Sequence, residues 1–116
     1  MKQMKYAEAE AVLAKAVSMR DGFADQKDWG GAAEHLAFAA SKDGHPRVTL
    51  QALAERATVL PNSPAALFLE AISHDSLHET KEAAVAYRAF LAVANGKFPD
   101  EEFQARHRLV ALDHMK

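Results

Sequence analysis

Two histidines four residues apart, His74 and His78, have the spacing in this chain that most resembles a metal site. Residues four apart share one face of a helix, and two imidazoles placed in this way can hold a zinc ion. The zinc-protease pattern also needs a glutamate directly after the first histidine, where the shorter Asp75 stands here. The sequence offers Glu79 as a neighbour but no evident third ligand. We therefore interpret the pair as structural and predict no metal and no other cofactor, with a histidine metal site as an alternative.

No other combination of residues predicts catalysis. The chain has no cysteine, which excludes a thiol nucleophile, a disulfide and any cysteine-based metal site. The pair Gly30-Gly31 follows no predicted strand and lacks the lysine of a phosphate-binding loop. Serine, histidine and aspartate are present, but they form no recognised nucleophile motif. We therefore expect a protein that is not an enzyme.

Composition predicts one helical domain or a short array of helical repeats. The 116 residues are 49% hydrophobic and 26% charged, as in ordinary globular proteins. There are 25 alanines, the best helix former, against only 5 glycines and 4 prolines. The net charge of −2 gives no positive field for nucleic acid or anionic lipid.

Membrane and export signals are also lacking in the sequence pattern. No apolar run reaches the roughly 18 residues that a membrane-spanning helix requires. The basic residues at positions 1–5 are followed by Tyr6-Ala-Glu-Ala-Glu, where a signal peptide would need an apolar stretch. This composition is compatible with a cytoplasmic and with a periplasmic or exported protein.

Apolar residues recur at intervals of three and four, and turn residues separate the periodic segments. Gly44 suits the left-handed end of a helix, and Ser63-Pro64 is a strong start signal, since serine caps free N–H groups. Pro99 fits the first turn of a last helix, and the three acidic residues after it place favourable negative charge at the positive end of the helix dipole. We predict helices over about 2–19, 29–42, 46–60, 64–78, 80–94 and from 99 onward, with a polar connector over 20–28.

A shift of 34 residues aligns the chain with itself. Ala37 falls on Ala71, Leu53 on Tyr87, and the turn residue Gly44 on His78. Small residues thus recur where two helices must approach closely, and large residues recur where a helix pair must be filled. The sequence therefore predicts two helix–turn–helix units, 30–63 and 64–97.

This pattern resembles the tetratricopeptide repeat (TPR) family. Its small residue in the first helix is matched by Ala37 and Ala71, and its closing proline by Pro61 but not by Asn95. The tryptophan usual near the start of a unit is missing. The segment from Phe68 onward is similar to the C-terminal end of certain bacterial TPR proteins. The resemblance implies an all-α, right-handed solenoid of antiparallel helix hairpins, with about six helices. Within it, 1–29 would be a partial first repeat and connector, and 98–116 a closing helix.

The resemblance also implies a non-catalytic scaffold that binds a protein or peptide segment in a concave groove. In the family, the first helix of each unit faces this groove. The alternative is that the aromatic residues of this set only pack between helices. The groove residues expected on this basis are Glu34, Phe38, Lys42, Phe68, Ile72, Asp75 and Arg106.

The segment 2–19 resembles the second helix of a repeat whose first helix is absent from this sequence. Its outer side, with Tyr6 and Val12, predicts a second use of the chain. Such a surface would pair with another copy or with further sequence of a longer protein. The alternative function is therefore self-association, as a homodimer through this helix, or spacing of domains within a larger bacterial protein.

Overall fold

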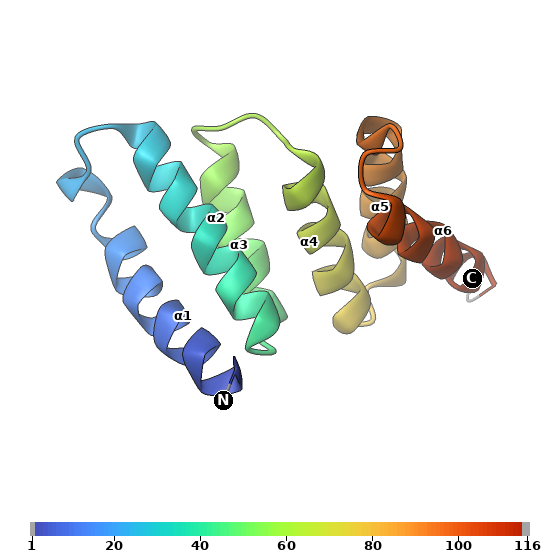
Figure 1. The fold of residues 1–116 in the computed structure, drawn as a ribbon, viewed down its shortest axis with the longest axis horizontal. Helices are drawn as coiled ribbons and strands as arrows, with labels where there is room; N and C mark the ends of the chain where they lie inside the picture. The colour runs from blue at the N-terminus through green and yellow to red at the C-terminus, as the bar shows by residue number, and fades with distance from the viewer. Residues whose placement is uncertain (1, 115–116) are drawn as a thin grey trace. The chain divides into compact units, whose positions relative to one another are not determined.

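The computed structural model describes the backbone of residues 2–114 and the side chains of residues 5–114. Across these residues the fold is entirely helical, with no strand, which confirms the predicted all-α class with six α-helices. Figure 1 shows them in chain order. Their bounds are α1 Lys2–Ser18, α2 Gln26–Lys42, α3 Pro46–Ala57, α4 Pro64–Ser76, α5 Thr80–Ala94 and α6 Pro99–Asp113, with a short 3₁₀ turn, η1, at Arg20–Gly22.

The chain forms two compact units, Met1–Pro61 and Asn62–Lys116. The first unit contains α1 and the hairpin of α2 and α3, and the second contains the hairpin of α4 and α5 followed by α6 (Figure 1). Each unit has buried hydrophobic residues of its own.

Most helix starts lie where the turn residues predicted them. Pro46, Pro64 and Pro99 each stand in the first turn of a helix, where a missing N–H has no consequence. Ser63 caps α4, because its hydroxyl oxygen accepts a hydrogen bond of 3.2 Å from the N–H of Ala66. These features confirm the start signals of the sequence.

Three predicted helix limits need correction. Helix α2 begins at Gln26 rather than Trp29, because the carboxylate of Asp25 accepts from the N–H of Lys27 and caps the helix early. Helix α3 ends at Ala57 instead of Leu60, and α4 ends at Ser76 instead of His78. Helix α5 begins at Thr80, as predicted, and Glu79 stands at its cap position.

The turns of the two hairpins share a backbone conformation. Gly44 has a φ of 80°, and His78, which lies 34 residues later, has a φ of 60°. Both residues are therefore left-handed and end the first helix of their hairpin. Glycine adopts this left-handed conformation without steric cost, whereas histidine adopts it rarely. The sequence therefore indicated the turn clearly only at Gly44.

The first unit is held together around Trp29. The indole ring is 2% exposed, and its N–H donates a 2.9 Å hydrogen bond to the carbonyl oxygen of Val17, which ties α2 to α1. Between α2 and α3, the fully buried Thr49 hydroxyl donates to the carbonyl oxygen of Ala37 at 3.0 Å. Small residues at this crossing let the two helices approach closely.

The second unit has an aromatic interior. Tyr87 and Phe90 of α5 are each 1% exposed, and Ala71 of α4 and Ala83 of α5 are fully buried beside them. Helix α6 closes this interior with Ala105 and Leu112. The small and large residues that the 34-residue spacing aligned are thus buried within both hairpins.

Candidate functional site

The first unit contributes an exposed aromatic residue to the predicted groove set. Phe38 lies on α2 and is 46% exposed. The ring of Tyr6 on α1 meets it edge-on, with 6.1 Å between ring centroids. The ammonium of Lys42, one turn along α2, lies 5.5 Å from the centre of the Phe38 ring. We call Tyr6, Phe38 and Lys42 the aromatic face of the first unit.

Glu34, one turn before Phe38 on α2, is engaged within the unit. Its carboxylate accepts a hydrogen bond of 2.8 Å from the Nε of Arg56 on α3. Arg56 is 6% exposed and also donates to the carbonyl oxygen of Pro61 at 2.8 Å. This guanidinium joins α2, α3 and the chain that leaves α3. Arg56 was not predicted from the sequence. The available signal was its spacing, because a charged residue three positions after the apolar Leu53 lies on the same helix face and needs an ion-pair partner there.

In the second unit, Phe68 and Ile72 lie on α4 and are only partly exposed, because they pack against the interior. The Phe68 ring centroid lies 5.1 Å from that of Phe90 and 6.4 Å from that of Tyr87. These distances are typical of stabilising aromatic pairs. Much of the apolar area of these two residues is therefore used inside the unit.

Asp75 connects the three helices of the second unit. Its carboxylate accepts two hydrogen bonds of 2.7 Å from Arg108 on α6 and one of 2.9 Å from the Tyr87 hydroxyl on α5. The Arg108 hydrogen bond, opposed by burial and assisted by Tyr87, lowers the pKa of Asp75. Burial raises the pKa of Tyr87, and the hydrogen bond to Asp75 raises this pKa by a smaller amount. Arg106, the last residue of the predicted groove set, is exposed on α6.

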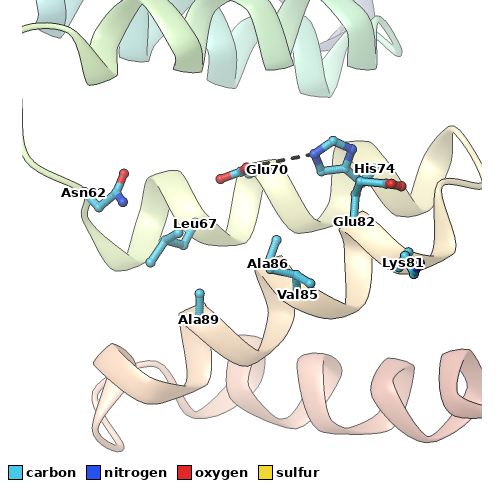
Figure 2. A pocket seen from close by; sticks show the side chains of 9 residues that line it. All are labelled: Asn62, Leu67, Glu70, His74, Lys81, Glu82, Val85, Ala86 and Ala89. Atoms are coloured by element: carbon cyan, nitrogen blue, oxygen red, sulfur yellow. Dashed lines mark ion pairs between the residues drawn. The ribbon is translucent and has the colours of Figure 1, made fainter.

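A cleft that the sequence did not indicate lies between α4 and α5, with a volume of about 440 Å³. Figure 2 shows its apolar side chains between the two helices and Glu70 and His74 on α4. The sequence pattern did not predict this cleft, because alanines have the same helical spacing whether the two helices pack tightly against them or leave a cleft beside them. The apolar lining comprises Leu67, Val85, Ala86 and Ala89.

His74 and His78 do not share a helical face, because α4 ends at Ser76 and His78 lies in the left-handed turn. His74 instead binds carboxylates: its Nδ1 lies 2.7 Å from Glu79, and its Nε2 lies 3.9 Å from Glu70. The geometry assumed for the histidine metal site is therefore absent.

Three potential metal ligands from different parts of the sequence do meet in the first unit. They are Glu10, Asp43 and His45, and one ligand atom from each lies within 4.8 Å of the others. The hydrogen bond and the negative charge of Glu10 raise the pKa of His45. Sequence reasoning missed this cluster, because Glu10 and His45 are 35 residues apart.

Comparison with protein-family models, with curated proteins and with solved structures gives no match for this chain. Within the residues that were described, no helix combines the length and apolar character needed to cross a membrane.

Proposed function

We propose that the chain is a non-catalytic scaffold of the TPR type, which binds a protein or peptide segment. Two similar helix hairpins support the architectural part of this proposal. Each hairpin has a left-handed residue at its turn, and these two residues, Gly44 and His78, are 34 positions apart in the sequence. Ala37 with Thr49, and Ala71 with Ala83, are fully buried at the helix crossings of their hairpins. A repeat of this kind predicts such agreement between hairpins, because each copy must solve the same packing problem.

The observation that carries the binding function is the exposure of Phe38. A phenylalanine that is 46% exposed leaves apolar area in water, and binding can recover this area. Tyr6 restricts the ring from one side, and Lys42 adds a positive charge beside it. An aromatic anchor with an adjacent charge is typical of peptide-binding surfaces. We propose a partner that places an apolar side chain on Phe38 and an acidic group near Lys42.

Selection from a displayed peptide library, followed by affinity measurement, tests this function. A peptide enriched on the wild-type chain is synthesised with a fluorophore, and its dissociation constant is measured by fluorescence anisotropy. We expect Phe38→Ala to weaken binding about 10- to 30-fold, the usual effect of removing an anchoring aromatic. Phe68→Ala would be a poor test, because Phe68 also packs against Phe90 and Tyr87.

Phe103→Ala is the matched control for this measurement. Phe103 is 68% exposed and stacks on His107 of the same helix, α6. It has the same side chain as Phe38 but is not part of the aromatic face. Equal affinities for Phe38→Ala and wild type, or equal losses for both variants, would contradict the proposed site.

Self-association through α1 is the second candidate function, and the exposure of Val12 favours it. Val12 is 70% exposed on α1, the helix that packs against α2 in the first unit. Sedimentation equilibrium over a range of concentrations tests this candidate. A dimer that Val12→Asp dissociates would support it, whereas a monomer at every concentration would eliminate it.

A further inference from the structure

We propose that Glu10, Asp43 and His45 form a binding site for a divalent transition-metal cation, with Zn²⁺ as the preferred ion. The three residues come from three elements of the first unit. Glu10 lies on α1, Asp43 is the C-terminal cap residue of α2, and His45 is the N-terminal cap residue of α3. The left-handed Gly44 reverses the chain between the last two. The fold itself therefore assembles the site.

The ligand atoms are close to the separations that a shared ion requires. The Nδ1 of His45 lies 2.8 and 3.0 Å from the two carboxylate oxygens of Glu10 and 3.4 Å from Oδ2 of Asp43. Zinc bound tetrahedrally at about 2.0–2.1 Å places its ligand atoms roughly 3.3 Å apart. The ligand atoms of Glu10, Asp43 and His45 all lie within 4.8 Å of one another, so side-chain adjustments alone can bring them to these separations.

Burial and charge give an independent reason for a cation at this position. The side chains of Glu10 and Asp43 are only 12% and 11% exposed, so most of each side chain is covered by the protein. Among residues 5–114, neither carboxylate has a Lys or Arg nitrogen within 4.0 Å, and the His45 imidazole is their ion-pair partner. Two carboxylates that share one imidazole as their ion-pair partner leave negative charge that a cation would neutralise.

The helix end increases this demand. Asp43 stands at the C-terminus of α2, where free carbonyl groups already concentrate partial negative charge. A carboxylate is therefore at the less favourable end of that helix. A divalent cation bound by Asp43 would offset both the carboxylate charge and the helix dipole.

The donor set favours zinc over calcium or magnesium. One imidazole nitrogen with two carboxylates suits a transition metal, whereas calcium takes six to eight oxygen ligands and magnesium prefers octahedral oxygen. His45 is 54% exposed, so a water molecule has access as a fourth ligand. The site is accordingly of the open, three-ligand type.

Calorimetric titration of tag-free protein with Zn²⁺, after treatment with a chelator and dialysis, tests the proposal. We expect one ion per chain. The variants Glu10→Gln, Asp43→Asn and His45→Ala should each weaken binding by more than the about 10- to 100-fold typical of outer-shell substitutions. In ¹⁵N NMR spectra, the ring nitrogens of His45 should shift on zinc addition, with Nδ1 changing most.

Two histidine variants serve as controls. His35→Ala removes an exposed histidine of α2 in the same unit, and His74→Ala removes the imidazole between Glu70 and Glu79. Both should bind zinc as the wild type does. The absence of zinc uptake, equal affinity in wild type and His45→Ala, or loss of binding in His74→Ala would each overturn the proposal. Tighter binding of Ca²⁺ than of Zn²⁺ would overturn the assigned metal. Circular dichroism of each variant checks that a loss of binding does not reflect unfolding.

Discussion

At the scale of single residues, Asp75 is the clearest case of a charged side chain with a structural use. The sequence predicted that Asp75 faces a groove, whereas in the structure its carboxylate accepts hydrogen bonds from Arg108 and Tyr87 inside the second unit. Its side chain is 16% exposed and that of Arg108 is 34% exposed, so this network lies in a partly buried position. Any partner that uses Asp75 must compete with Arg108 for it.

Asp75→Asn should destabilise the protein at neutral pH by about 1–3 kcal/mol, because a partly exposed, charge-assisted network is lost. The pKa of Asp75 is lowered below its ordinary value of 3.8 in the folded state. Its stabilising effect is therefore present above that value and is lost as the pH falls through the lower, folded-state pKa. Urea denaturation at pH 7 and at several pH values below 3.8 measures this, and the difference in stability between wild type and variant should shrink as the pH falls.

The exposed pair of Arg88 and Asp113 provides the control for this experiment. Their side chains are 52% and 48% exposed, and a guanidinium nitrogen of Arg88 lies 2.9 Å from Oδ1 of Asp113. Arg88→Gln should cost less than about 1 kcal/mol, whereas Arg108→Gln should resemble Asp75→Asn. Equal effects of the two arginine variants would show that the Asp75 network adds no more than a surface ion pair.

At the scale of helices, Glu102 shows how a cap can come from within the helix. The sequence predicts only favourable first-turn charge for the acidic residues after Pro99. In the structure, Glu102 is 7% exposed, and its carboxylate accepts from the N–H groups of Gly96 and Phe98 at 3.1 and 2.9 Å. It thereby satisfies backbone donors of the turn that leads into α6.

Glu102→Ala should destabilise the protein by about 1–3 kcal/mol, because it leaves two backbone donors of a partly buried turn without their acceptor. Glu101→Ala, one position earlier in α6, should change stability by less than about 0.5–1 kcal/mol, since it removes only helix-dipole charge. Thermal melting followed by circular dichroism measures both variants. Equal melting temperatures for the two would contradict the capping role.

Two adjacent glycines in α2 give a sharp test of helix packing. A Cβ at Gly30 would lie 2.6 Å from Cγ2 of Val59 and 2.9 Å from Cδ1 of Leu60, whereas a Cβ at Gly31 would meet nothing within 4 Å. Gly30→Ala should therefore be less stable than Gly31→Ala by about 1–3 kcal/mol, through overpacking. Gly31→Ala should itself be stabilising by up to about 1 kcal/mol from helix propensity. Urea denaturation ranks the pair, and the reverse order would contradict the packing of Val59 and Leu60 on α2.

At the scale of the whole molecule, the sequence predicted helices well and contacts between them poorly. Prolines, Ser63 and Gly44 act on neighbouring backbone, so they located helix limits to within a few residues. The exposed position of Phe38 and the partly buried position of Phe68 could not be told apart from the sequence, because both residues follow the same helical period. Nor was the Glu10–His45 contact, which depends on how three elements pack.

The division into two units predicts that a core substitution acts first on the unit that contains it. Leu112 is 2% exposed in the interior of the second unit, so Leu112→Ala should destabilise that unit by about 2–5 kcal/mol. Trp29, the sole tryptophan, lies in the first unit and reports its unfolding by fluorescence. In urea, the circular dichroism of Leu112→Ala should begin to change at a lower urea concentration than that of the wild type. The midpoint of the Trp29 fluorescence transition should shift less than the circular dichroism transition does.

Leu36→Ala is the reciprocal variant, because Leu36 is 5% exposed on α2 of the first unit. It should lower the Trp29 fluorescence midpoint more than Leu112→Ala does. If both variants shift fluorescence and circular dichroism by the same amount, the chain unfolds as one cooperative body. Separate shifts would instead show that each unit is stabilised mainly by its own interior.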